Sequence, residues 1–203
     1  MKKTLLLLAG LSLFASQANA APSTLTLNFD DVPEGSIQDE YGDMPTYKGF
    51  NFSSTLDWIN VEDSPNWNYG AKSGDFALLN NNSGTGTITE ENGEDFTFDG
   101  LWAKKWATPK ESGGVDSLFG TLQGYNNDAQ VWSVDTSLNG SYEFYGAQAG
   151  LIDELKLGFG DAFLVDNVAL NAVSPVPEPS SIALMLGGLG LVGFMAARRA
   201  KKA

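Results

Sequence analysis

Phe96-Thr-Phe-Asp-Gly-Leu-Trp102 alternates apolar and polar side chains with the two-residue period of a half-buried strand. Similar runs recur between Gly, Asn, Asp and Ser clusters, and Asn139-Gly140 is typical of hairpin turns. Residues 54–74 are the least regular and predict a long loop. The predicted strands are 25–30, 50–53, 77–79, 85–89, 96–104, 117–125, 130–135, 142–145, 154–159 and 163–171. About ten short strands without a helical period predict an all-β fold, a single jelly-roll-like β-sandwich.

The first 20 residues have the three parts of a secretory signal peptide. Lys2 and Lys3 supply the positive region, residues 5–14 supply the apolar core, and Ala18-Asn19-Ala20 supplies a small-residue cleavage site. We therefore expect export through the Sec translocon and cleavage after Ala20.

The last 28 residues contain three different parts in a fixed order. Val176, Pro177, Glu178 and Pro179 form a proline-rich turn, residues 182–197 form an uncharged apolar run, and four basic residues follow. Two serines precede the run, and a helix needs roughly 17–25 residues to cross a bilayer, so we predict one transmembrane helix. The basic end predicts a cytoplasmic C-terminus. A plain tail anchor and a buried core helix are the alternatives.

This tail resembles the PEP-CTERM sorting signal of Gram-negative bacteria, because the Pro-Glu-Pro turn, the glycine-bearing apolar run and the basic end occur in the same order. The resemblance implies processing near Pro177-Glu178-Pro179 by an exosortase, a membrane protease-transpeptidase. It also implies an inner-membrane intermediate and a final place at the cell surface or in the exopolysaccharide matrix. The predicted domains are the signal peptide 1–20, the ectodomain 21–175 and the sorting segment 176–203.

The charge of the chain is concentrated in the ectodomain. It holds 24 of the 25 acidic residues and six of the 12 basic residues, which gives it a formal charge of −18. Nucleic acid is therefore excluded as an expected partner, since phosphate binding needs a basic surface. The chain has no cysteine and no histidine, which excludes disulfides, thiolate or histidine metal sites, and His-dependent catalysis. An acidic surface suits hard cations such as calcium, or simply keeps an exported protein soluble.

The ectodomain resembles the jelly-roll domains common in PEP-CTERM proteins, which are similar in layout to carbohydrate-binding modules. The segments that carry this resemblance are Leu27-Asn-Phe-Asp-Asp-Val-Pro33, Tyr47-Lys-Gly-Phe-Asn-Phe-Ser53, Phe96-Thr-Phe-Asp-Gly-Leu-Trp102, Gly124-Tyr125 and Phe163-Leu-Val-Asp-Asn-Val168. The resemblance implies a structural calcium ion that joins the first strand, an early loop and the last strand. Its ligands would be Asp30 or Asp31, with Asp75 and Asp166; alternatively, Asp166 caps a strand or faces water.

Aromatic residues with polar neighbours are the candidate sugar-binding residues. Trp58, Trp67 and Tyr69 lie in the irregular region among Asn and Asp residues, and Trp106 lies in a predicted loop. Exposed indole rings can stack on the C–H faces of sugars while amides and carboxylates bind the hydroxyls. The alternative is core packing, since aromatic residues dominate small β cores. Trp102 alternates with Phe98, which predicts a core position for it.

Paired carboxylates are the remaining candidates for chemistry, because two acids about 5–10 Å apart can hydrolyse glycosidic bonds. The pairs in the sequence are Glu62/Asp63, Glu90/Glu91 with Glu94/Asp95, and Asp153/Glu154. All lie in predicted turns or at strand ends, where nothing promises the burial that a catalytic acid needs. We therefore expect a non-enzymatic protein that binds polysaccharide. A structural matrix protein without a ligand and a carboxylate-based glycoside hydrolase are the alternatives.

Overall fold

The computed structural model describes residues 24–33, 40–81, 84–109, 116–172 and 188–189. Contacts divide the chain into the unit Pro22–Pro175 and a second unit made of Met1–Ala21 and Val176–Ala203. The predicted signal peptide and the sorting residues 176–179 lie outside the described residues, as does the predicted membrane helix apart from two residues. Within the described ranges, no helix is long and apolar enough to cross a bilayer.

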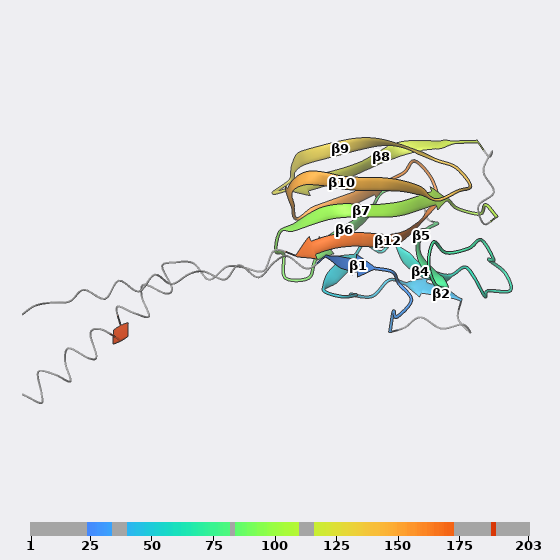
Figure 1. Cartoon of the computed structure of the whole chain (residues 1–203), viewed down its shortest axis with the longest axis horizontal. Coiled ribbons are helices and arrows are strands. Elements are labelled where there is room, and N and C mark those ends of the chain that lie inside the picture. The colour runs from blue at the N-terminus through green and yellow to red at the C-terminus, as the bar shows by residue number, and fades with distance from the viewer. Residues whose placement is uncertain (1–23, 34–39, 82–83, 110–115, 173–187, 190–203) are drawn as a thin grey trace, which may run out of the picture. The chain divides into compact units, whose positions relative to one another are not determined.

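The described ectodomain is an antiparallel sandwich of two sheets, which confirms the predicted all-β sandwich (Figure 1). Sheet A has the order β10-β7-β12-β5-β4-β2, with β1 beside β12, and sheet B has the order β3-β6-β11-β8-β9. From β6 onward the chain passes repeatedly between the sheets, as in a jelly roll. The strands are β1 Leu25–Leu27, β2 Tyr41–Asp43, β3 Phe50–Phe52, β4 Asp57–Asn60, β5 Phe76–Asn80, β6 Gly86–Glu90, β7 Phe96–Lys105, β8 Leu118–Asn126, β9 Ala129–Leu138, β10 Glu143–Ile152, β11 Glu154–Gly158 and β12 Phe163–Ala172.

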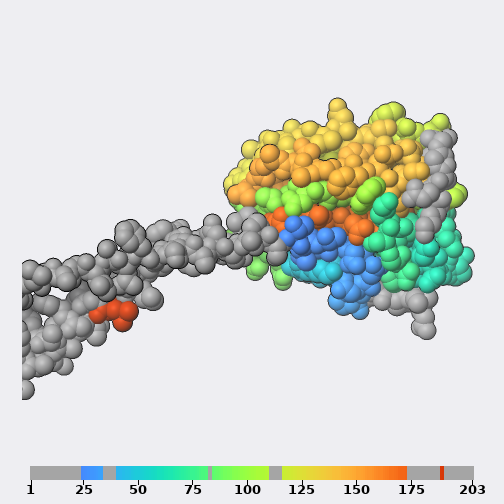
Figure 2. Space-filling model, viewed as in Figure 1, coloured from blue at the N-terminus to red at the C-terminus, as the bar shows by residue number. Residues whose placement is uncertain are grey.

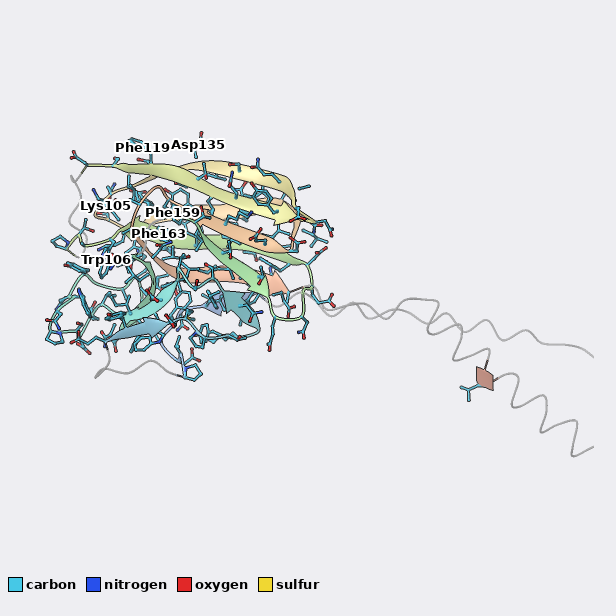
Figure 3. The ribbon with its side chains drawn as sticks, turned by 180° about the vertical axis from the view of Figure 1, so that it is seen from behind. Lys105, Trp106, Phe119, Asp135, Phe159 and Phe163 are labelled. Carbon is cyan, nitrogen blue, oxygen red and sulfur yellow. The ribbon has the colours of Figure 1, made fainter. Side chains whose placement is uncertain are left out.

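The main core lies between the two sheets. It contains Phe98 of β7, Leu155 of β11, Leu122 of β8 and Phe163 of β12, all fully buried, together with Phe159 in the turn before β12 (Figure 3). Fully burying a large apolar side chain contributes about 1.5–3 kcal/mol each. The alternating pattern that predicted these strands is therefore the pattern that fills the core.

A second apolar cluster lies on the opposite face of sheet A. Ile59, Leu79 and Leu164 belong to this cluster, whereas their sequence neighbours Trp58 and Leu78 belong to the main core. Side chains of successive strand residues point to opposite faces, so sheet A is buried on both sides here. Residues 61–75 form a loop that covers the outer side, and Val61 and Ala71 of this loop join the cluster.

This double burial explains one wrong prediction. Residues 54–74 were expected to form a loop, but they contain β4, whose four residues are all buried. A strand that is buried on both faces does not alternate, so it has no period-two signal. Strand β10 was predicted only as residues 142–145, because its continuation Gly146-Ala-Gln-Ala-Gly150 is also without alternation.

Trp102 lies outside both apolar clusters, so its predicted core position is wrong. Phe98, Leu101 and Ala103 all face the main core, which means that β7 changes the phase of its alternation between residues 98 and 101. Gly100 has φ +143° at this point, a conformation that L side chains rarely adopt. The shift turns Trp102 to the outer face, where it is half-buried beside Phe144, with ring centroids 5.1 Å apart.

Candidate functional site

The fully buried carboxylate of Asp166 binds the loop that covers sheet A. Its Oδ2 accepts hydrogen bonds from the backbone N–H groups of Lys72 and Ser73, each at 2.9 Å, and its Oδ1 accepts one from the N–H of Asn167 at 2.6 Å. The hydroxyl of Ser73 donates to Oδ1 of Asn167 at 2.9 Å. Strand β12 thus fixes the end of the loop through hydrogen bonds to its backbone.

Asp75 is the last residue of this loop, and Asp30 accepts its backbone N–H, so the structure brings the three predicted metal ligands to one region. Oδ1 of Asp30 accepts the N–H groups of Asp75 at 2.9 Å and Phe76 at 3.2 Å. A Cβ atom added at Gly74 would lie 2.1 Å from the carboxylate of Asp30, which explains a glycine at this position. Asp31, the alternative ligand, is held instead by the Tyr47 hydroxyl and by Lys48 at 3.0 Å.

The environment of Asp166 and of Asp75 raises the pKa of each carboxyl group. Burial raises the pKa of Asp166 to about 7, against the lowering effect of the three N–H groups, and the negative charge of Asp30 adds to the increase. Asp75 is exposed, and slight desolvation together with the charges of Asp63, Asp30 and Glu62 raises its pKa. A buried carboxylate without a counter-cation favours its neutral form.

The carboxylates of Asp30 and Asp166 are occupied by hydrogen-bond donors in the described residues. Calcium needs six to eight oxygen ligands, whereas the groups that hydrogen-bond to these two carboxylates in the described residues are N–H donors, which cannot coordinate a cation. In the described residues, no group of three or more acidic side chains is arranged to hold a metal. Calcium at Asp30, Asp75 and Asp166 therefore stays a prediction.

Three of the four predicted sugar-binding residues gather on the outer side of sheet A. Trp67, Tyr69 and Trp106 are half-buried and pack on the second apolar cluster. The rings of Tyr69 and Trp106 meet edge to face at 4.9 Å, and Trp67 meets Tyr41 in the same way at 5.2 Å. Part of each ring is therefore covered by packing against the sheet or a neighbouring ring, and this packing holds the loop on sheet A.

Trp58 is a correction to the predicted sugar-binding set. Its side chain is only 3% exposed and belongs to the main core, where it packs near Phe76 with ring centroids 6.0 Å apart. A ring enclosed by apolar side chains cannot stack on a sugar. The polar residues beside Trp58 in the sequence suggested that its ring is exposed. In the structure, both faces of β4 are buried, one in the main core and the other in the second apolar cluster.

Lys104 has a structural role that the sequence did not indicate. Its side chain is fully buried, and its ammonium donates to the carbonyl oxygens of Tyr69 at 2.8 Å, Thr108 at 3.1 Å and Pro109 at 3.3 Å. It also lies 5.4 Å from the centroid of the Tyr142 ring. Lys104 thus joins the loop 61–75 and the segment after β7 to strand β7 through its buried side chain.

Two of the predicted carboxylate groups act as turn caps. Glu90 accepts the N–H groups of Asn92 at 2.6 Å and Glu94 at 3.1 Å, and these bonds lower its pKa against the effect of burial. Asp153 accepts the N–H of Asn127 at 2.8 Å. Both carboxylates accept backbone N–H groups at hairpin ends. This is a structural role, as expected of acids in turns, and it needs no catalysis.

One opposed acidic pair was missed by the sequence reading. Asp43 of β2 lies directly opposite Asp57 of β4, and burial, followed by the charge of Asp43, raises the pKa of Asp57. Asp57 is buried, whereas Asp43 is exposed. The pair therefore lacks the two buried acids that the hydrolase alternative requires.

The outer face of sheet B carries a polar network that sequence reasoning did not find. Nε2 of Gln123 donates to Oε1 of Gln130 at 3.0 Å, and the Tyr125 hydroxyl donates to the same oxygen at 3.3 Å. Lys156 lies 4.0 Å from the centroid of the Tyr125 ring and pairs with Glu154 at 3.1 Å. Three neighbouring strands, β9, β8 and β11, thus present amide, hydroxyl and charged groups around one aromatic ring.

This face is bounded by a second aromatic ring. Phe119, on the same side of β8 as Gln123, is 72% exposed. It lies six residues from Tyr125, about 20 Å along the strand. Between the two rings, Thr121 stands opposite Asp135 of β9, and Figure 3 shows Phe119 and Asp135 together, with Trp106 across the core from them. We name the outer face of sheet B around Phe119, Thr121, Gln123, Tyr125, Gln130, Ser133, Asp135, Glu154 and Lys156 the β8–β9 face.

Comparison with known proteins gives two kinds of similarity. The PEP-CTERM protein-sorting motif matches residues 175–200, so the chain carries this motif. The ectodomain is similar to a tandem of two family 22 carbohydrate-binding modules from Paenibacillus barcinonensis Xyn10C, at 13% identity over 80% of this chain and 49% of that chain, with a TM-score of 0.43.

Two single modules are also similar. They are the xylan-binding domain from the same Xyn10C, at 12% identity over 78% of this chain and all of that chain with a TM-score of 0.42, and the C-terminal family 22 module of Clostridium thermocellum Xyn10B, at 12% identity over 64% and 89% with a TM-score of 0.35. No curated protein matches the chain.

The titration of Asp166 predicts an unusual pH dependence of stability. The pKa of Asp166 in the folded protein, about 7, lies above its ordinary value of 3.8. The folded state therefore binds the proton more tightly than the unfolded state does. The resulting stabilisation of the fold is fully present below pH 3.8 and is lost as the pH rises through 7. We expect the melting temperature to fall between pH 5 and 8, a range in which the chain has no histidine to titrate. Asp166→Asn should flatten this decline, as measured by thermal unfolding.

The same measurement tests calcium. An ion bound to Asp166 would favour the ionised carboxylate, so millimolar calcium should raise the melting temperature at pH 8 and a chelator should reverse the increase. Equal melting temperatures with calcium and with chelator would show that the predicted calcium site is wrong.

Proposed function

We propose that this chain is an exported protein whose ectodomain binds polysaccharide without catalysis, through the β8–β9 face. The observation that carries the proposal is the network on this face, where Gln123, Gln130 and Lys156 surround the ring of Tyr125. Sugars combine apolar ring faces with hydroxyl groups, and a flat sheet that offers aromatic rings with amide donors and acceptors matches both. Strand β11 pairs with β8 in regular register, and an irregularity in the β8–β9 pairing beside Tyr125 places Gln130 opposite it.

The length of the face favours a polymer over a single sugar. Phe119 and Tyr125 are about 20 Å apart along β8, and polar side chains fill the interval. An extended ligand could contact both rings and the groups between them. A structural matrix protein without a ligand is the second candidate, favoured by the acidic surface that keeps the ectodomain soluble.

The sorting motif supports a route to a polysaccharide-rich surface. We infer that the Sec translocon exports the chain in a Gram-negative bacterium, that the C-terminal segment holds it briefly in the inner membrane, and that an exosortase processes it near Pro177-Glu178-Pro179. The mature ectodomain then remains at the cell surface or in the extracellular matrix. This route delivers a polysaccharide-binding domain to the place where its ligand is made.

Removing the ring of Tyr125 should weaken polysaccharide binding. We expect Tyr125→Ala to lower the affinity for exopolysaccharide of the native host about tenfold, a loss of about 1.4 kcal/mol, because the substitution removes the aromatic surface on which a sugar ring would stack. Affinity electrophoresis against this polysaccharide, followed by a glycan array, measures the effect. Trp67→Ala is the matched control, because it removes a half-buried ring from the other side of the sandwich.

The control also decides between the two candidate surfaces. Loss of binding in Trp67→Ala with normal binding in Tyr125→Ala would move the site to the aromatic residues on sheet A. Failure of the unchanged protein to bind any polysaccharide would favour the purely structural function.

Replacing Glu178 should stop processing. In the native host, Glu178→Gln removes the charge between two prolines while keeping a similar side-chain size, so we expect full-length protein to accumulate in the inner-membrane fraction. Immunoblotting of fractionated cells measures this, with mass spectrometry of the mature C-terminus. Normal maturation of the variant would contradict the exosortase route.

A further inference from the structure

An aromatic pair lies on the outer face of sheet A, beside the loop 61–75. Phe144 of β10 is opposite Trp102 of β7, and Trp102 is opposite Asp166 of β12, so the three side chains form one row across neighbouring strands. The centroids of the two rings are 5.1 Å apart, and the Phe144 side chain is 55% exposed. Figure 2 shows the side of the domain on which β10, β7 and β12 lie next to one another. The two rings therefore form one apolar surface that solvent reaches.

The ring of Phe144 lies along the sheet. A Cβ atom added at Gly100, on the neighbouring strand β7, would lie 2.7 Å from Cζ and 2.9 Å from Cε2 of this ring. One side of the ring therefore rests over the backbone of Gly100, in the space that a side chain would fill. Because the Phe144 side chain is still largely exposed, the opposite side of the ring is open to a flat apolar ligand surface.

A lysine of the loop 61–75 lies over the second ring of the pair. Nζ of Lys72 is 3.9 Å from the centroid of the Trp102 ring, within the range of a cation–π contact. The backbone N–H of Lys72 donates to Oδ2 of Asp166, the residue opposite Trp102 in the pairing of β7 with β12. The hydrogen bond that fixes the end of the loop therefore also places the ammonium group above the ring.

The ammonium group of Lys72 has no oxygen partner in the described structure, where its contact is with the ring of Trp102. Each of the other lysines in the described ranges either pairs with a carboxylate or donates to a backbone carbonyl, and these are Lys48, Lys104, Lys105 and Lys156. A cation beside an apolar surface, with its hydrogen-bonding capacity unused, is complementary to an anion that also has an apolar face.

We propose that Lys72, Trp102 and Phe144 form a second sugar-binding site, which takes an acidic sugar such as a uronic acid residue of a polysaccharide. The C–H face of the sugar ring stacks on the two aromatic rings, and its carboxylate pairs with the ammonium of Lys72. An inorganic anion would use the lysine alone, and a neutral sugar would use the rings alone. The site lies on the other sheet from the β8–β9 face and does not depend on it.

Matched acidic and neutral sugars test this proposal. Calorimetric titration of the full-length chain in a nonionic detergent would use trisaccharides of galacturonic, glucuronic and mannuronic acid, each beside the form whose carboxyl groups are reduced to alcohols. A salt concentration of 0.15 M, with a Debye length of about 8 Å, limits repulsion by the acidic ectodomain. We expect at least one acid to bind about fivefold more tightly than its neutral form, the upper end for an exposed ion pair.

Variants of the three residues assign this preference to the site. Lys72→Met keeps the backbone N–H that binds Asp166 and removes the charge, so it should abolish the preference for the acid, whereas Lys72→Arg should retain it. Phe144→Ala should weaken binding of the acidic and the neutral form alike, because stacking does not depend on the carboxylate. Equal affinities for the acidic and neutral forms, or no binding of any acid, would overturn the proposal.

Lys156→Met is the matched control on the other sheet. The ammonium of Lys156 lies 4.0 Å from the centroid of the Tyr125 ring, much as Lys72 lies over Trp102, but it already pairs with Glu154. This variant and Tyr125→Ala should both keep the preference for the acid, even where Tyr125→Ala weakens polysaccharide binding at the β8–β9 face. Loss of the preference in either variant would place the acidic sugar on sheet B and contradict the second site.

Discussion

The buried carboxylate of Asp166 is the contact on which the covered face of sheet A depends. By accepting the N–H groups of Lys72 and Ser73, it holds the loop 61–75 against the outer side of sheet A. That side consequently becomes a second apolar cluster, covered by Trp67, Tyr69 and Trp106. The corresponding side of sheet B keeps its polar side chains open to solvent. The sandwich therefore has one covered face and one open face.

Much of the fold could be predicted from alternation. The strands around Phe98, Leu122 and Leu155 have one face in the main core and one polar face, which gives a clear two-residue period. The period fails where the physical environment differs. Strand β4 is buried on both faces, β10 is a weakly patterned edge, and the glycine conformation at Gly100 reverses the side-chain alternation before Trp102.

The aromatic group on sheet A and the β8–β9 face were less predictable, because their residues meet only through strand pairing. Trp67, Tyr69 and Trp106 were recognised as aromatic residues in loops, and they do gather, but their shared packing surface comes from sheet A. Gln123 and Gln130 join across the β8–β9 hairpin, which the turn at Asn126-Asn-Asp128 could have revealed. Lys156 reaches Tyr125 only through the pairing of β11 with β8, a contact that depends on topology.

An NMR titration with host exopolysaccharide fragments tests the central claim most directly, because it observes both faces in one experiment. If the β8–β9 face binds polysaccharide, the side-chain amide signals of Gln123 and Gln130 should shift with increasing ligand, while the indole N–H signals of Trp67 and Trp106 stay in place. Shifts of the two indole signals with unchanged glutamine signals would contradict the account and assign binding to sheet A.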